Sequence, residues 1–75
     1  MTQTLLDLKG LKCPLPALKA RKALKSIAAG HELAVICTDL MAAIDIPNLI
    51  RETGDQLISQ ESKAGIITFV IRKGG

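Results

Sequence analysis

Aromatic residues are almost missing from this sequence, because Phe69 is the only one and tryptophan and tyrosine are absent. A core must therefore be built from leucine, isoleucine, valine and alanine. The 75 residues predict one small domain over residues 1–75, and a chain of this size buries only roughly 60% of its unfolded surface. Little room for an internal cavity is expected in such a domain.

Long apolar runs are missing as well. No stretch approaches the ~20 apolar residues that cross a membrane, and the N-terminus lacks the basic region and apolar run of a signal peptide. We therefore expect a soluble, cytoplasmic protein with no membrane partner. Thiols stay reduced in that compartment, so Cys13 and Cys37 are expected to be free.

Metal ligands and phosphate-binding loops are also scarce. His31 is the only histidine, and one histidine with two distant cysteines does not make a zinc site. A surface position is expected for His31, and a cysteine–histidine pair stays open. The glycines do not have the spacing of a phosphate loop. The sequence predicts no metal and no cofactor.

A second cysteine near Cys13 is absent, because Pro16 stands where a Cys-x-x-Cys pair would have it. A thioredoxin-like protein needs that resolving thiol. Without it, a Cys13 that carries an extra sulfur atom has no neighbouring thiol to attack it. This arrangement suits a thiol that holds a group and passes it to another protein.

The stretch from Gly10 to Pro16 contains the most distinctive chemistry in the chain. A helix is predicted after it, with Pro14 as the first helical residue and Cys13 as the N-cap. The Leu15 N–H would then donate to the sulfur, and the helix dipole would favour the thiolate. The alternative, a buried structural cysteine before a helix, stays open.

Basic residues cluster around this stretch, with no acid between positions 9 and 25. Lysines beside a cysteine are expected to lower the thiol pKa. They also suggest an acidic partner surface or a nucleic acid. The cluster holds six of the ten basic residues, namely Lys9, Lys12, Lys19, Arg21, Lys22 and Lys25.

Hydrophobic periodicity and glycine positions predict the order βαβαββ. Apolar residues at helical spacing (Ala17, Ala20, Leu24 and Ile27) mark a buried helix face. Gly30 and Gly54 are expected to end the helices, and residues 40–44 are a loop or an irregular turn. The predicted elements are strands Thr4–Leu8, Glu32–Thr38, Gln56–Ser62 and Ile66–Arg72, and helices from about Ala17 to Ala28 and from about Asp45 to Thr53. This order predicts an α+β fold, a two-layer sandwich in which both helices cover one face of a four-stranded mixed sheet.

The remaining polar and apolar candidates have simpler expectations. Cys37 alternates with apolar residues along a strand and should be buried. Leu15 and Leu18 lie off the buried helix face, either as an apolar rim that docks a partner near Cys13 or as partly packed side chains. Asp39, Asp45 and Asp55 are expected to serve turns and caps. Asp7 interrupts an apolar strand and is expected to have a structural role.

The pattern Asp7-x-x-Gly10-x-x-Cys13-Pro14-x-Pro16 resembles the signature of the TusA sulfur-carrier family, also called SirA-like. Further similarities are Gly30, Thr38-Asp39, Asp45-Ile46-Pro47 and the ending Ile71-Arg72-Lys73-Gly74-Gly75. One departure is Asp39-Leu40, where the family commonly has Asp-Pro.

The resemblance implies the same sandwich fold and a sulfur carrier rather than a turnover enzyme. Cys13 would take sulfur as a persulfide from a cysteine desulfurase or a rhodanese-like donor. It would pass the sulfur to an acceptor such as a DsrE-like protein, toward tRNA 2-thiouridine, or alternatively in dissimilatory sulfur oxidation. The supporting residues would be Pro14 and Pro16, which shape the loop, with Lys12, Leu15, Lys19 and Lys22.

A carrier must expose its thiol to two partners in turn, so we expect a monomer. We expect no direct contact with nucleic acid. Two other functions stay open on the residues alone: a small RNA-binding module, which the basic helix would suit, and a thiol-dependent regulator.

Overall fold

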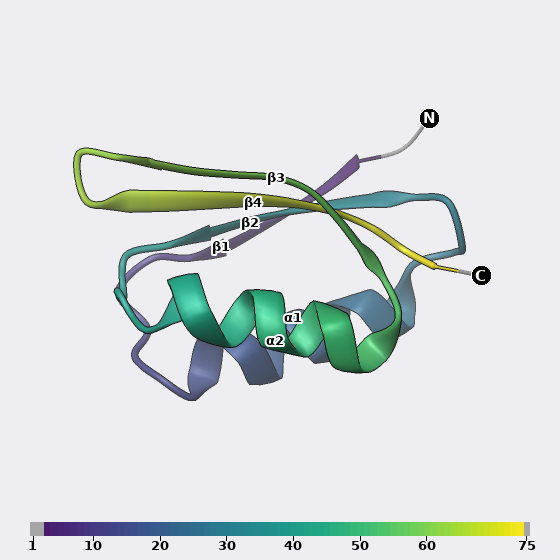
Figure 1. The fold of residues 1–75 in the computed structure, drawn as a ribbon, viewed down its shortest axis with the longest axis horizontal. Helices are drawn as coiled ribbons and strands as arrows, with labels where there is room; N and C mark the ends of the chain where they lie inside the picture. The colour runs from purple at the N-terminus through teal and green to yellow at the C-terminus, as the bar shows by residue number, and fades with distance from the viewer. Residues whose placement is uncertain (1–2, 75) are drawn as a thin grey trace.

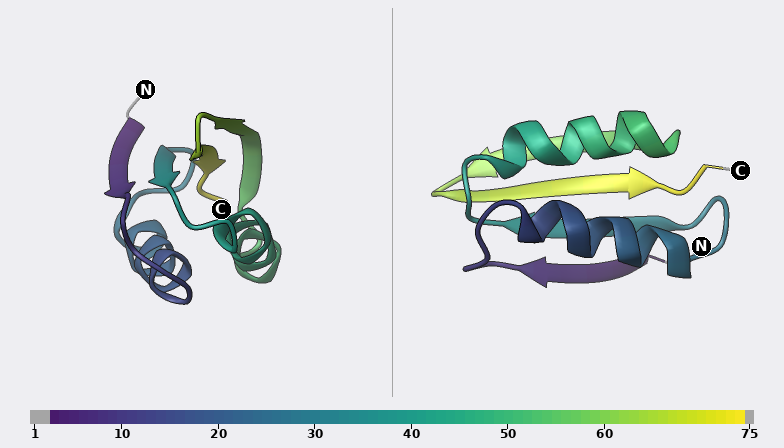
Figure 2. Two further views of the ribbon diagram at one scale, coloured as in Figure 1. Left: turned by 90° about the vertical axis from the view of Figure 1, so that its left-hand side faces the viewer. Right: turned by 90° about the horizontal axis from the view of Figure 1, so that it is seen from below.

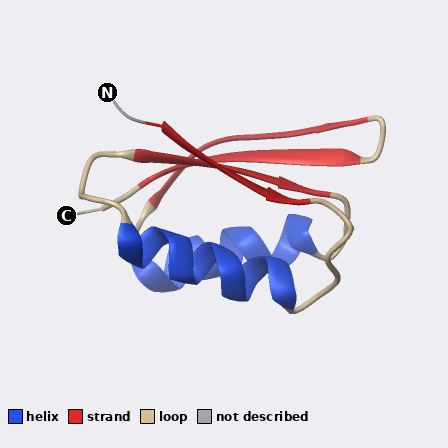
Figure 3. Ribbon diagram, turned by 180° about the vertical axis from the view of Figure 1, so that it is seen from behind, coloured by secondary structure: helices blue, strands red, loops and turns tan. Residues whose placement is uncertain are grey.

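Six elements alternate in the order βαβαββ in the computed structural model, which describes residues 3–74 (Figure 1). Both helices lie on the same face of a four-stranded sheet (Figure 3). The predicted fold class, a two-layer α+β sandwich, is therefore confirmed. The elements are β1 Gln3–Leu8, α1 Leu15–Ser26, β2 Glu32–Cys37, α2 Ala42–Thr53, β3 Gln56–Lys63 and β4 Ile66–Arg72.

The strands are arranged in the order β1-β2-β4-β3. β1 and β2 are parallel and pair from Gln3–Glu32 to Leu8–Cys37, whereas β4 is antiparallel to both β2 and β3. Because β1 and β2 run in the same direction, their carboxyl ends meet at one end of the sheet. The loops that lead into α1 and α2 therefore start side by side (Figure 2).

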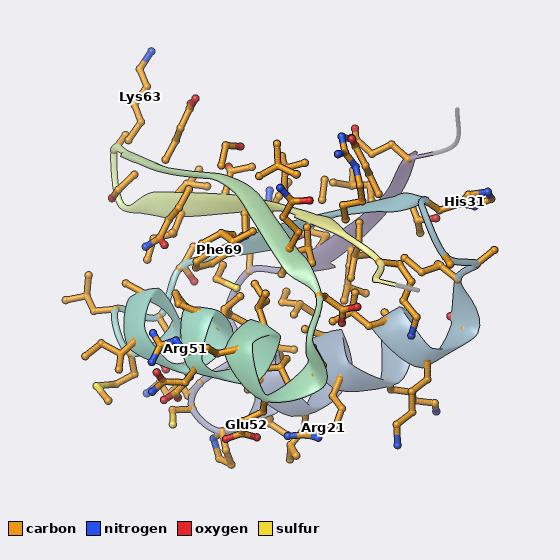
Figure 4. All side chains as sticks on the ribbon, turned by 45° about the vertical axis from the view of Figure 1, so that its right-hand side comes forward. Arg21, His31, Arg51, Glu52, Lys63 and Phe69 are labelled. Atoms are coloured by element: carbon orange, nitrogen blue, oxygen red, sulfur yellow. The ribbon has the colours of Figure 1, made fainter. Side chains whose placement is uncertain are left out.

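The core fills the space between the sheet and the two helices. Alternating residues of β2 and β4 point into it, and Cys37 is fully buried there, as predicted. The single aromatic ring, Phe69, is also fully buried between the sheet and α2 (Figure 4). The innermost side chains are Leu24, Leu33, Val35, Cys37, Ile46, Phe69 and Ile71.

Helix α1 begins and ends about two residues earlier than predicted. Its buried face is the predicted one, because Ala20 and Leu24 are almost inaccessible. The helix ends at Ser26, whose hydroxyl donates to the Ala23 carbonyl at 2.8 Å and competes with the helical bonding pattern. The prediction that Gly30 ends the helix is wrong. Gly30 adopts a left-handed φ of 86° in the turn before β2.

Helix α2 begins at Ala42, three residues before the predicted start. Asp39 closes the preceding turn: its carboxylate accepts the Met41 N–H at 3.2 Å, and its carbonyl accepts the Ala42 N–H at 3.0 Å. Asp45 is consequently in the first turn and is not the N-cap, and Pro47 lies inside the helix.

The chain after α2 follows the sequence prediction closely. Gly54 ends α2 in the left-handed conformation, and its N–H donates to the Ile50 carbonyl at 3.1 Å. β3 and β4 form a hairpin whose turn, Ala64-Gly65, has positive φ at both residues. Gly75, the last residue of the C-terminal motif, lies outside the described residues.

Candidate functional site

Cys13 lies in the loop between β1 and α1, and its side chain is exposed. Its backbone N–H donates to the Asp39 carboxylate at 2.6 Å. The Gly10 N–H donates to the Thr38 hydroxyl at 2.9 Å. Both acceptors follow β2, so two side chains from the neighbouring parallel strand fix the position of the cysteine loop.

The Cys13 thiol donates a hydrogen bond to the Asp45 carboxylate, with 2.9 Å between Sγ and Oδ2. This bond is the main reason why the pKa of the Cys13 thiol is raised above its ordinary value. Partial desolvation and the negative charges of Asp45 and Asp39 raise this pKa further. The resting site therefore favours the thiol over the thiolate.

The predicted activation of Cys13 by the helix N-terminus is wrong. Helix α1 begins at Leu15, with Pro14 before it, and no side chain caps this end. The Leu15 N–H donates to the Lys12 carbonyl at 2.9 Å and not to the sulfur. A carboxylate thus occupies the place beside the thiol where the sequence predicted only positive potential.

The predicted lysines are only partly near the thiol. The Lys9 amine lies 3.7 Å from the Asp7 carboxylate. Lys19 and Lys22 line a separate hollow of about 290 Å³ that does not include Cys13. Lys12 is the one predicted lysine that lines a hollow together with Cys13. Asp7 also accepts the Lys9 N–H at 3.0 Å, which fits its predicted structural role.

Two hollows share Cys13. The first, of about 470 Å³, is lined by residues 10–13 and 38–40. The second, of about 320 Å³, is lined by both helices and includes Pro14, Leu18 and Asp45. Arg21 and Glu52 also line this second hollow, and they form an ion pair at 3.0 Å between α1 and α2 (Figure 4). A partner group could approach the sulfur atom from either side.

Exposed apolar side chains lie on the segments that flank the thiol. Leu15 and Leu18 are 44% and 54% exposed, so neither is packed away. The segment after β2 adds three side chains that the sequence analysis did not single out, namely Leu40, Met41 and Ile44. We refer to Leu15, Leu18, Leu40, Met41 and Ile44 as the apolar rim.

The remaining residues singled out in the sequence, Pro16, His31 and Cys37, do not line the surface around the Cys13 thiol. Pro16 is fully buried in the first turn of α1. His31 is exposed and precedes β2, at the opposite end of that strand from Thr38, so a cysteine–histidine pair is excluded (Figure 4). Burial raises the pKa of Cys37 to about 11. Between residues 3 and 74, no group of three histidine, cysteine or acidic side chains could hold a metal ion.

The sequence predicts Asp45 only as a helix cap, so its contact with the Cys13 thiol is a finding of the structure. Asp45 is 32 positions from Cys13. The available signal was the βαβ order itself. A βαβ unit makes adjacent parallel strands, and residues that follow two parallel strands converge at one end of the sheet.

Comparison with known proteins agrees with the fold and the motif. The family model described as Sulfurtransferase TusA matches residues 4–73. The chain belongs to the TusA family. It is 38% identical over 68 residues to the sulfur carrier protein TusA of Allochromatium vinosum, covering 91% of this chain and 90% of that one. It is 40% identical over 68 residues to the sulfur carrier protein TusA of Pseudomonas entomophila, covering 91% and 85%.

A solved structure supports the same assignment. The crystal structure of a SirA-like protein from Desulfitobacterium hafniense matches with a TM-score of 0.84 and 25% identity, covering 99% of this chain and all of that one. TusA-family carriers work in sulfur relays with partner proteins. Within the described part of the chain, no helix is long and apolar enough to span a membrane.

Proposed function

We propose that this TusA-family protein carries sulfane sulfur as a persulfide on Cys13. The donor would be a cysteine desulfurase or a rhodanese-like protein. The acceptor would be a relay protein such as a DsrE-like protein, and the sulfur would go toward tRNA 2-thiouridine. The observation that supports this function best is an exposed thiol with no second thiol in reach, since the other cysteine, Cys37, is fully buried.

The proposed chemistry is thiol exchange on a persulfide. The Cys13 sulfur attacks the outer sulfur of the donor persulfide, and the donor cysteine leaves. An acceptor thiol later attacks the outer sulfur on Cys13 in the same way. Because Cys37 is fully buried in the core, it is shielded from the loaded sulfur, and we expect no collapse of the persulfide into an internal disulfide.

The apolar rim supports the idea that partner proteins dock directly over the thiol. Its five side chains are each more than 40% exposed and lie on α1 and on the segment after β2, the two parts of the chain that contact Cys13 or follow it. Exposed apolar patches on small soluble proteins mark interaction sites. Lys12 beside this rim would favour an acidic partner surface.

The two rival functions receive less support. Recognition of single-stranded RNA uses exposed aromatic rings for base stacking, and Phe69 is buried. A redox sensor needs an accessible cysteine of low pKa. The pKa of Cys13 is raised, so peroxide would find little thiolate.

Intact mass spectrometry tests the proposal. The protein is incubated with a cysteine desulfurase and cysteine, without reductant, and then with dithiothreitol. We expect a gain of one sulfur atom that dithiothreitol removes. Cys13→Ser should not gain it, and Cys37→Ser is the matched control that should. Protein that gains no sulfur from an active desulfurase or from a loaded rhodanese would refute the carrier function.

A further inference from the structure

The Asp45 carboxylate differs from the other aspartates near the loops. Asp7, Asp39 and Asp55 each accept at least one backbone N–H, which accounts for them as turn or loop residues. Within residues 3–74, the only hydrogen bond to the Asp45 carboxylate comes from the Cys13 thiol, and Asp45 forms no ion pair. Its side chain is half-buried in the first turn of α2. As an acidic residue in the first turn it interacts favourably with the dipole of α2, but within residues 3–74 its carboxylate accepts no backbone N–H.

We propose that Asp45 is a catalytic residue that takes the proton of Cys13 when sulfur is loaded and returns it when sulfur is released. This role rests on the carrier function proposed above. The distance of 2.9 Å between Sγ and Oδ2 is within the reach required for direct proton transfer. The structure thus offers the thiol one proton acceptor.

The loading step balances without an oxidant or a reductant. A bond forms between Cys13 Sγ and the outer sulfur of the donor persulfide, and the bond between the two donor sulfur atoms breaks. The Cys13 proton moves to Asp45 and then to the sulfur of the leaving donor cysteine. The products are a Cys13 persulfide and a donor thiol.

Release runs in the opposite direction. An acceptor thiol gives its proton to Asp45 and attacks the outer sulfur on Cys13. The bond between that outer sulfur and Cys13 Sγ breaks, and Cys13 leaves and receives the proton from Asp45. One carboxylate therefore serves both half-reactions.

The other charged groups around Cys13 are less well placed for this role. The Asp39 carboxylate, which follows β2, binds the Cys13 backbone N–H and not the thiol. Arg21 on α1 and Glu52 on α2 line the shared hollow but pair with each other at 3.0 Å. Lys12 precedes Cys13 and can only donate hydrogen bonds.

The test combines two measurements on Asp45→Asn. The first is the pH dependence of iodoacetamide alkylation of Cys13. The second is the rate of sulfur loading by a cysteine desulfurase and cysteine. Asparagine removes the charge and the proton acceptor, so the alkylation midpoint should move to lower pH. Loading should nevertheless fall by roughly 100-fold, the loss typical of a missing general base.

Two further variants serve as controls. Asp55→Asn makes the same chemical change beyond the other end of α2 and should leave both measurements unchanged. Asp45→Glu keeps a carboxylate at the same helix position and should recover part of the loading rate. Circular dichroism should give the same spectrum for all variants. If Asp45→Asn misfolds, Asp45→Ser takes its place: slow loading together with an alkylation midpoint at lower pH supports the role, and loading at the wild-type rate opposes it.

The outcomes separate this proposal from the carrier function. Wild-type protein that loads, with Asp45→Asn loading equally well or faster, overturns the proton-transfer role and leaves the carrier function intact. An unshifted alkylation midpoint in Asp45→Asn also overturns it, because the thiol is then not bonded to Asp45. Wild-type protein that takes no sulfur refutes the carrier function and this role with it.

Discussion

The two cysteines of this chain have the same chemistry and opposite surroundings. Cys13 is exposed in a loop, and Cys37 is fully buried on β2. The pKa of both thiols is raised, but a hydrogen bond to Asp45 is the main cause at Cys13 and desolvation is the main cause at Cys37. A raised thiol pKa therefore does not distinguish a functional cysteine from a structural one. Access and the nature of the neighbouring group do.

Alkylation of the native protein should show the largest difference between the two thiols. We expect iodoacetamide to modify Cys13 at least about 100-fold faster than Cys37, because Cys37 reacts only after the core opens. Peptide mass mapping after timed quenching measures both rates in one sample. Alkylation in urea, where both thiols are exposed, gives the reference rates. Equal alkylation rates for Cys13 and Cys37 in the native protein would contradict the burial of Cys37 in the core.

The alkaline limit of stability should depend on Cys37 more than on Cys13. The pKa of Cys37 is about 11 in the folded chain, above the value of about 8.5 for an unperturbed thiol. Its stabilising contribution is complete below the unfolded pKa and is lost as the pH rises toward the folded one. Urea unfolding at pH 8 and pH 10.5 should show a smaller alkaline loss for Cys37→Ala than for the wild type.

Cys13→Ala is the matched control for this measurement, since the exposed Cys13 does not belong to the hydrophobic core. Its free energy of unfolding at pH 8 should differ from the wild type by no more than about 0.5 kcal/mol. Cys37→Ala should cost more at that pH because it leaves a cavity in the core. An alkaline loss that Cys37→Ala does not reduce would argue against the raised pKa.

Asp39→Asn should produce the smallest of these effects, a lower pKa for both the Cys13 and the Cys37 thiol. The Asp39 charge raises the pKa of both thiols, whereas the Asp45 charge acts on Cys13. Asparagine has a single acceptor oxygen, which can keep the shorter bond from the Cys13 N–H, whereas the bond from the Met41 N–H is lost. Thiol titration by ultraviolet absorbance should show both pKa values lowered in Asp39→Asn, and only that of Cys13 lowered in Asp45→Asn.

Most of the fold could be predicted from the sequence, because the hydrophobic periodicity and the turn residues indicate the same elements. The apolar face of α1, the glycine at the end of α2 and the hairpin turn each follow from short-range patterns. The start of α2 does not follow from such patterns, because the side chain of Asp39, outside the predicted helix, closes the turn that precedes α2.

The site was predictable only in part, and for a different reason. Cys13 could be found from its own neighbours in the chain, including Pro14 and the missing cysteine at position 16. The protonation state of Cys13 could not be predicted, because it depends on Asp45, which is far away in the sequence. The parallel pairing of β1 and β2 brings the start of α2, and with it Asp45, to the thiol. Six basic residues nearby in sequence proved less important for the pKa than two distant carboxylates.

The distance along the chain between Cys13 and Asp45 has a consequence during synthesis. The thiol emerges from the ribosome 32 residues before its carboxylate partner, and a domain acquires its structure only once the interacting segments are available. A nascent chain therefore presents Cys13 with the thiolate fraction of an ordinary cysteine. Folding of the whole domain, which needs β4 in the middle of the sheet, brings Asp45 to the thiol and lowers both that fraction and the rate of adventitious oxidation. Cys13 is thus less reactive toward oxidants in the folded protein than in the nascent chain.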